Sequence, residues 1–263
     1  FSTDGQQQQA FDLRTGQLRP GLPEAGLPVW GAFAIDSDRL CIYGSNSIVV
    51  FSLARNAVEW TYDSKGDNIT SGVVSDGARV YFGTYSKKFT AVNLADGKKE
   101  WNVSTGKEFA VSAAAGDGAV CYGTMTTGFH VLDAATGVEN YQLPLCALWN
   151  SSVVVAGGLY LSDSAACHAY SIADGKEIWT FPWPAASEPG ALSLCGGSVY
   201  CGTTGALIVL DMETGNERWR FECEGRPTWP PAVSADTVFV TTDKGWLYAV
   251  GAQPEETPGT GER

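Results

Sequence analysis

The chain has 263 residues, of which 44% are hydrophobic and 17% are charged, so it has enough apolar material for a core and too little charge for a disordered protein. Its formal net charge of −12 disfavours binding to nucleic acid or to an anionic membrane surface. No apolar run approaches the ~18–20 residues of a membrane-spanning helix, so we expect no direct membrane insertion.

The N-terminal residues do not look like a translation start. The chain begins with Phe1 and continues into a run of four Gln, with no initiator Met and neither the basic nor the apolar region of a signal peptide. We therefore expect a processed form or a fragment of a longer protein, with any anchor or signal outside this chain.

A short motif recurs along the chain, and its spacing indicates the fold. Six copies align without gaps around an apolar stretch and a Gly or Asn turn, and a seventh is degenerate. The third position, or its equivalent, in each copy is Asp12, Ser52, Asn93, Asp133, Ser171, Asp211 and Gly251. Successive markers lie 38 to 41 residues apart, a regularity that chance does not produce.

Each copy belongs to a set of four short strands. A β-rich run ending near Gly precedes the motif, as in 40–44, 80–83, 120–123 and 199–202, and another alternating strand lies before it. The order is strand A, strand B, strand C, an Asp/Thr-Gly turn, and strand D. Four short strands in ~40 residues are typical of a propeller blade. We therefore predict an all-β, single-domain β-propeller of four-stranded antiparallel blades over residues 1–252, followed by a disordered or linker tail over 253–263.

The number of blades depends on the two ends of the chain. Five full sets run from about residue 29 to 222, and a sixth has only strands A to C, at 232–234, 238–241 and 246–250. The segment up to about residue 18 is expected to supply the missing outer strand and close the ring, because closure removes exposed sheet edges. This gives six blades; a surplus strand at 9–13 leaves seven as the alternative.

A large aromatic residue follows the turn of five copies by four positions. These residues are Trp60, Trp101, Tyr141, Trp179 and Trp219. The pattern Ala-x-Asp-x-x-Thr-Gly-x-x-x-Trp resembles the tryptophan-docking repeat of pyrroloquinoline-quinone-type propellers, with its best matches at 210–219 and 94–101. The resemblance covers nearly the whole chain. It implies that these aromatics are structural, each packing against the next blade near its Thr-Gly turn.

The chemistry of the enzymes in that family is missing. Those enzymes hold the quinone and Ca²⁺ in an eight-bladed ring, with a vicinal Cys-Cys disulfide and a carboxylate base. This chain has no adjacent cysteines, at most seven copies and no matching metal-ligand spacing. His130 and His168 fit ordinary positions in strand C. We therefore expect no catalytic residue, no metal and no cofactor.

Seven cysteines are present, an odd number. Cys41, Cys121 and Cys201 lie in strand B, where a thiol acts as a small buried hydrophobe. Cys146 and Cys167 flank strands A and B of one blade on the same face. A disulfide between them is one hypothesis and two free thiols are the other. A disulfide would favour an extracytoplasmic location, in the periplasm or on the cell surface.

The loops that join strand D to the next strand A are the candidate binding site. They surround one mouth of the expected channel and carry Trp30, Phe109, Trp149, Trp183 and Trp229, with Lys87, Lys88 and Lys244 on B→C loops of the same face. Aromatic residues around a funnel are suited to a protein or peptide partner or to a small ligand. The alternative is that these rings plug the channel or stack on neighbouring blades.

Three functions remain open, because a propeller scaffold hosts many activities. The first is a non-catalytic ligand- or protein-binding scaffold of the cell envelope. The second is the sensor domain of a larger bacterial receptor such as a Ser/Thr kinase. The third, disfavoured by the missing motifs, is a quinone-dependent dehydrogenase.

Overall fold

The computed structural model describes nearly all of the repeated region. The described residues are 2–3, 8–11, 17–19, 29–107, 109, 113–124, 126–145, 152–184, 189–234 and 237–251. They form 26 β-strands and contain no helix, which confirms the all-β prediction. Over this part of the chain, no helix long and apolar enough to cross a membrane is found.

Two compact units divide the chain. The first comprises Phe1–Trp149 with the short segments Val155–Gly157 and Ile172–Gly175. The second comprises Asn150–Val154, Gly158–Ser171 and Lys176–Arg263. The predicted domain boundaries at 1–252 and 253–263 stay a prediction, and residues 252–263 lie outside the described part of the chain.

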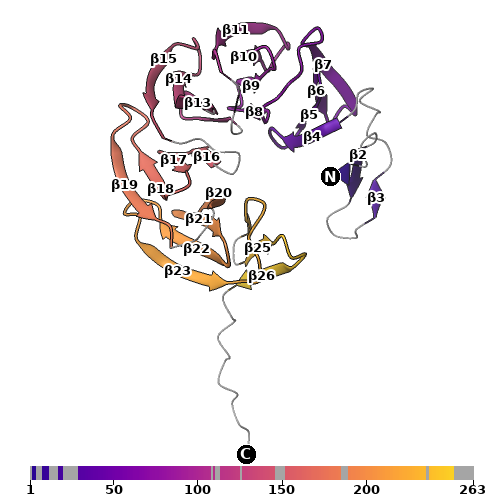
Figure 1. The fold of residues 1–263 in the computed structure, drawn as a ribbon. Helices are drawn as coiled ribbons and strands as arrows, with labels where there is room; N and C mark the ends of the chain where they lie inside the picture. Colours follow the sequence, from indigo (N-terminus) through magenta and orange to yellow (C-terminus); the bar gives the residue numbers. More distant parts are fainter. Residues whose placement is uncertain are drawn as a thin grey trace, which may run out of the picture. The chain divides into compact units, whose positions relative to one another are not determined.

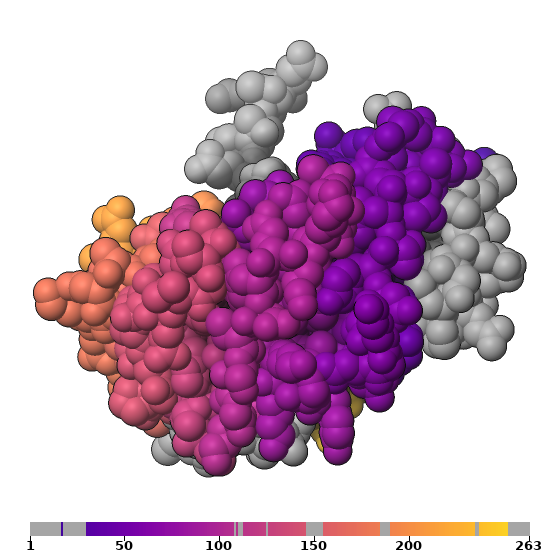
Figure 2. Space-filling view, turned by 90° about the horizontal axis from the view of Figure 1, so that it is seen from above, coloured from indigo at the N-terminus to yellow at the C-terminus, as the bar shows by residue number. Residues whose placement is uncertain are grey.

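The first unit contains three complete four-stranded sheets, which follow one another in chain order (Figure 1). Their strands are β4 (Val29–Ala34), β5 (Arg39–Gly44), β6 (Ser47–Ser52) and β7 (Ala57–Asp63); β8 (Val74–Ser75), β9 (Arg79–Gly83), β10 (Lys88–Asn93) and β11 (Lys99–Ser104); and β12 (Ala114–Gly116), β13 (Ala119–Thr124), β14 (Gly128–Asp133) and β15 (Glu139–Leu143). In the space-filling view the indigo to magenta residues of this unit form one continuous surface (Figure 2).

The remaining strands repeat this plan. They are β16 (Ser152–Val155), β17 (Leu159–Ser162), β18 (Ala166–Tyr170) and β19 (Glu177–Pro182); β20 (Pro189–Cys195), β21 (Ser198–Thr203), β22 (Ala206–Asp211) and β23 (Glu217–Glu222); and β24 (Ala232–Val233), β25 (Thr237–Thr241) and β26 (Leu247–Gly251). Every sheet is antiparallel, with chain neighbours paired, and the last sheet has three strands where its neighbours have four.

The N-terminal segment forms a small sheet of its own. Its strands are β1 (Ser2–Thr3), β2 (Gln8–Phe11) and β3 (Leu18–Arg19), and β2 pairs with both of the others. Strand β2 coincides with most of the surplus strand expected at 9–13. The pairings given by the described residues therefore make this segment a separate three-stranded sheet. Ring closure and the choice between six and seven blades stay predictions.

The core lies between neighbouring sheets. In the complete sheets, the second and third strands are buried almost throughout, as in β13 and β14, while fourth strands such as β11 alternate between exposed and half-buried. One hydrophobic cluster joins β4–β7 to β8–β11, and another joins β8–β11 to β12–β15. In the second unit, similar clusters join β16–β19 to β20–β23 and β20–β23 to β24–β26. Within each unit, neighbouring sheets therefore bury their facing sides against each other.

A β-bulge recurs at one position in all five complete sheets of the described chain. It lies between the third and fourth strands, directly after the residue that pairs with the docking aromatic. The pairs are Val50–Trp60, Ala91–Trp101, Val131–Tyr141, Ala169–Trp179 and Val209–Trp219. Bulges redirect side chains and increase local twist. The fourth strand therefore presents its aromatic in the same way in every repeat.

Candidate binding surface

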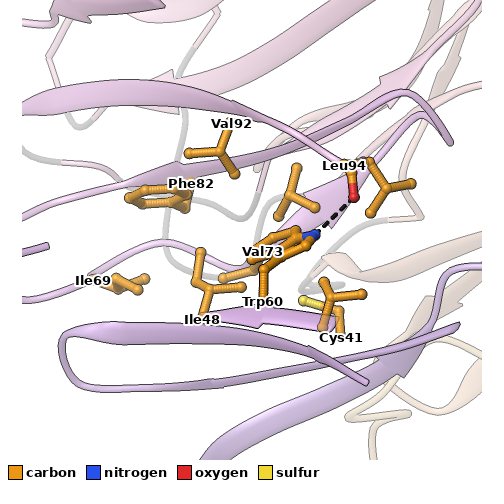
Figure 3. Packing of buried hydrophobic residues seen from close by; sticks show 10 residues of the cluster. Cys41, Ile48, Trp60, Ile69, Val73, Phe82, Val92 and Leu94 are labelled. Carbon is orange, nitrogen blue, oxygen red and sulfur yellow. Dashed lines mark hydrogen bonds between the residues drawn. The ribbon is translucent and has the colours of Figure 1, made fainter. Parts of the chain in front are cut away.

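Trp60 shows how an aromatic residue joins two sheets. Its ring is buried, and its indole Nε1 donates a hydrogen bond of 2.7 Å to the carbonyl oxygen of Leu94, at the end of the next sheet's third strand (Figure 3). The ring also lies against Gly97, whose φ is +68°, and a Cβ there would come within 2.7 Å of the indole. Glycine is therefore required at this turn both for its left-handed backbone and for the close approach of the ring.

Three further aromatics repeat this arrangement. The indole of Trp101 donates to the Ala134 oxygen at 3.1 Å, and the indole of Trp179 donates to the Met212 oxygen at 3.1 Å. The Tyr141 hydroxyl takes the place of an indole and donates to the Ile172 oxygen at 3.0 Å. The glycine beneath each ring has φ between +66° and +72°; these residues are Gly137, Gly215 and Gly175. These contacts are the geometry that the repeat resemblance implies.

Trp219 differs from these four aromatics. It has the same bulge and register, but its side chain is 38% exposed. Its ring contacts Tyr200 of its own sheet, with centroids 6.4 Å apart. It lines a groove of about 580 Å³ together with Cys195, Arg218 and residues of the β24–β26 sheet. The turn that would correspond to Gly215 follows Gly251 and lies outside the described residues. Docking of Trp219 on the next blade therefore stays a prediction, because the turn that would receive it is not among the described residues.

Two of the expected loop aromatics are core residues. Phe109 is 5% exposed and packs against Phe89 and Tyr122. Trp183 is 9% exposed, and its Nε1 donates to the Asp163 oxygen at 2.9 Å. Neither ring has a free face, which removes both from the predicted binding set. Both contact a neighbouring sheet, as in the alternative that the loop aromatics stack on neighbouring blades.

Two other expected aromatics are exposed, one in each unit. Trp30 is 57% exposed and lies within strand β4, and Trp229 is 71% exposed in the loop before β24. Trp149 lies outside the described residues. Two further large apolar side chains that the sequence analysis did not select, Trp246 and Leu247, are exposed at 52% and 65% near the end of the β24–β26 sheet where Lys244 lies.

The loops that carry the expected lysines are held by backbone hydrogen bonds. In the first unit, the Ser86 amide donates to Asp67 Oδ1 at 2.9 Å, which fastens the Lys87–Lys88 turn to the preceding loop. Lys87 is half-buried with φ of +62°, and Lys88 is exposed. In the second unit, the Arg226 amide donates to Asp243 Oδ1 at 2.9 Å beside the exposed Lys244. Both loop pairs are therefore built as fixed surfaces.

The two histidines are buried strand residues. His130 Nδ1 lies 2.7 Å from Glu139 Oε2, its Nε2 lies 2.7 Å from Thr127 Oγ1, and its ring stacks on Tyr122. His168 Nδ1 contacts Thr180 Oγ1 at 3.1 Å, and its Nε2 lies 3.6 Å from Asp163 Oδ1. No serine or cysteine nucleophile is hydrogen-bonded to either ring within the described residues.

The Cys146–Cys167 disulfide stays a hypothesis, because only one of its two cysteines lies in the described structure. Cys167 is a free buried thiol in β18, and its Sγ lies 3.9 Å from Cys201 Sγ. Cys146 lies outside the described residues. Burial raises the pKa of the Cys201 thiol, so it stays protonated and unreactive at neutral pH. The described part of the chain also brings together no group of three or more His, Cys, Asp or Glu side chains that could hold a metal ion.

The first unit contains a groove that was not predicted from the sequence. It has a volume of about 420 Å³ and lies between the end of β7 and the face of the β8–β11 sheet. Lys88 is the single residue in its lining that belongs to the predicted binding set. The others that carry charge are Asp63, Lys65, Asp67 and Lys99.

The repeated four-stranded sheets, with four of their aromatic residues docked on the following sheet, define a β-propeller. The family model described as outer membrane protein assembly factor BamB matches residues 3–148 and 162–254. The chain belongs to this family.

Known structures and sequences agree with this fold. The crystal structure of BamB from Moraxella catarrhalis superposes with a TM-score of 0.71 at 20% identity, covering 86% of this chain and 69% of that one. The computationally designed Ika8 protein gives a TM-score of 0.67 at 13% identity, covering 93% and 90%. Serine/threonine-protein kinase AfsK from Streptomyces griseus is 30% identical over 159 residues, which are 54% of this chain and 20% of the kinase. The chain thus spans about a fifth of that relative's length.

Proposed function

We propose that the chain is a non-catalytic, protein-binding scaffold of the bacterial cell envelope, outside the cytoplasm. The observation that carries the proposal is the exposure of Trp30 and Trp229, while the docking aromatics Trp60 and Trp179 are buried. Large exposed aromatics cost solubility, and aromatic residues supply most of the energy at protein interfaces. Membership of the BamB family supports a role in assembly rather than catalysis.

The partner surface is expected to include the loop before β24, which carries Trp229. Trp229 is followed by two prolines, and its loop is fastened to the Asp243–Lys244 turn, so the ring is presented from a fixed backbone. Prior fixing of an anchor lowers the entropy lost on binding. Lys244 adds a positive charge in a protein of net charge −12, which favours a partner with acidic residues near its apolar contact.

Binding is tested by affinity capture from envelope extracts with tagged wild type and the Trp30→Ala/Trp229→Ala variant. The matched control is Ile178→Ala, because Ile178 is also 56% exposed but lies on strand β19. We expect the double variant to lose partners that wild type and the control retain, with an unchanged circular dichroism spectrum. Equal capture by all three proteins would exclude this surface.

A second function is favoured by the kinase match. In that case this chain is the sensor part of a longer receptor, and its loops bind a ligand rather than an assembly partner. An immunoblot of the source cells with antibodies to this chain separates the two proposals. A receptor kinase has a mass several times the 27.9 kDa of this chain and carries protein-kinase activity in an immunoprecipitate, whereas a scaffold fractionates with the envelope and lacks that activity.

A further inference from the structure

The groove beside β7 combines an aromatic wall with three lysines in its lining. We propose that it binds a small organic monoanion, a carboxylate attached to a flat apolar body. The inference goes beyond the proposed function, because it concerns a small-molecule site that needs no protein partner.

The sheet β8–β11 builds the floor of the groove. Residues directly opposite each other on antiparallel strands share a face of the sheet. Phe82 pairs with Thr90, and Thr90 pairs with Asn102, so these three side chains form one row across the sheet. All three line the groove. Phe82 and Thr90 are almost fully buried and form the base of the groove, whereas the exposed Asn102 can offer its amide to a bound molecule.

The bulge beside Trp101 adds Lys99 to this face. Strict alternation along β11 would place Lys99 and Asn102 on opposite faces. The register shift between Ala91 and Val92 makes Lys99 pair with Val92, two residues after Thr90 and on the same face. Lys88, two residues before Thr90, lies on that face as well. Both lysines therefore line the groove from the same sheet.

The opposite wall comes from β7 and the loop after it. The ring of Tyr62 is half-buried and packs on Phe82, with centroids 5.4 Å apart and an interplanar angle of 59°. This contact fixes the phenol as a flat apolar wall. Lys65 follows in the loop, where its φ of +58° is a conformation that costs free energy in a residue with a Cβ. The loop thus holds a third amine at the rim.

The charges of the groove favour one negative charge on the ligand. Within the described residues, none of Lys65, Lys88 and Lys99 has a carboxylate within 4.0 Å, unlike Lys98, which pairs with Asp96 at 2.7 Å. The two carboxylates in the lining already accept hydrogen bonds from the protein. Asp63 accepts one from the Lys65 amide at 2.8 Å, and Asp67 accepts one each from the Ser86 amide and hydroxyl. Three lysines and two aspartates leave one positive charge, which matches a carboxylate better than a phosphate dianion.

The groove has the size and lining of a small-molecule site. Its volume of about 420 Å³ falls within the ~300–1,000 Å³ of ligand pockets, which combine apolar walls with a few polar groups. A phenyl or indole ring on Tyr62 would place a carboxylate on a short chain within reach of the lysines at the rim. The same chemistry occurs in a free aromatic acid and at the C-terminus of a short peptide.

The test is calorimetric titration of the full chain at low salt with 3-phenylpropionate. Neutral 3-phenylpropan-1-ol and phenyl phosphate report on charge. N-acetyl-Leu-Phe and its amide separate a peptide terminus from a free acid. We expect the carboxylate to bind at least fivefold more tightly than the alcohol and more tightly than the phosphate. Tighter binding of the peptide acid than of 3-phenylpropionate would assign the site to peptide C-termini, and the reverse would assign it to free acids.

The variants compare two pairs of lysines in the same region. Lys88→Gln/Lys99→Gln removes two groove charges, and Lys98→Gln/Lys107→Gln removes two charges outside the groove. We expect the first pair to weaken 3-phenylpropionate binding about fivefold to tenfold, the range that two exposed ion pairs supply, and the second to leave it within about twofold. Equal weakening by both pairs, or no binding to wild type, would overturn the proposal. Thermal midpoints within about 2 °C of wild type show that each variant is folded.

Discussion

Two junctions of the second unit carry the same aromatic residue in different surroundings. Trp179 and Trp219 occupy the same position, after the same bulge, in consecutive sheets. Trp179 reaches the Met212 oxygen and the Gly215 turn and is 8% exposed, whereas Trp219 has no such turn among the described residues and is 38% exposed. The strand that carries the aromatic is therefore not what buries it. The acceptor turn of the following sheet does so.

The largest effect that tests this comparison is truncation of the two indoles. Trp179→Ala should lower the free energy of unfolding by about 3–5 kcal/mol, as for other buried aromatics, and should leave the Met212 oxygen without its donor. Trp219→Ala should cost about 1–2 kcal/mol, because part of the ring is already in water. Urea denaturation followed by circular dichroism measures both. Equal losses would show that Trp219 is docked in solution.

The acceptor turn can be tested without touching the indole. Gly215→Ala places a methyl group 2.6 Å from the Trp179 ring at a φ of +71°, and we expect a loss of about 2–4 kcal/mol. Gly205→Ala in the same sheet has a φ of +80° but nothing within 4 Å, so it reports the backbone cost alone, about 1–2 kcal/mol. If the two variants unfold at the same urea concentration, contact with the ring contributes nothing.

Each of the two junctions contains a cysteine, and a thiol reagent can compare how accessible the two side chains are. Cys201 is fully buried in the docked core, whereas Cys195 is exposed at the groove beside Trp219. Cys201→Ser should cost about 1–3 kcal/mol, because it buries a hydroxyl in an apolar cluster, and Cys195→Ser should cost less than ~0.5 kcal/mol. In the native protein Cys195 should react with a thiol reagent and Cys201 should not. Rapid native labelling of Cys201 would mean that the docked junction opens.

The smallest expected effect is a change in thermal stability at acid pH. Hydrogen bonding and charge from Arg218, then the Thr214 amide and hydroxyl, hold the pKa of Asp211 below its usual range, and Asp211 shapes the turn that carries Gly215. Because the folded pKa is lowered, this contribution is complete above the ordinary aspartate pKa of ~3.9 and is lost as pH falls through the folded value. Asp211→Asn should lower the thermal midpoint by a few degrees at pH 6, and the difference from wild type should shrink between about pH 4 and 2.

The neighbouring Glu213→Gln variant is the control for this pH series. Glu213 lies in the same turn, and its side chain is exposed. A pH-independent difference between wild type and Asp211→Asn would mean that the carboxylate charge does not hold the turn. A difference equal to that of Glu213→Gln would mean that the effect is one of net charge.

The repeat motif predicts which aromatic residue a sheet contributes to the junction with the next sheet. It does not predict whether the next sheet supplies an acceptor turn. Trp60, Trp101, Tyr141 and Trp179 were identifiable from their distance to the Gly turn, because the motif fixes both bulge and register. The exposure of Trp219 depends on the following repeat, whose copy is degenerate at Gly251. The burial of Phe109 and Trp183 depends on contacts with side chains of other strands, which residue spacing does not encode. Lys99 was missed because a bulge breaks the alternation by which faces are assigned.

The docking contacts described for Trp60, Trp101, Tyr141 and Trp179 all run in one direction, each sheet giving its aromatic to the sheet that follows in the chain. An array built in this way has a direction, because a repeat supplies an aromatic residue to the repeat that follows it and an acceptor turn to the one that precedes it. A repeat grafted after the last sheet must bring a glycine turn, and one grafted before the first must bring the aromatic. Recombination between genes that encode these repeats should therefore preserve the junctions when it joins repeats at equivalent positions. The number of repeats can then change while the docking contacts between them stay the same.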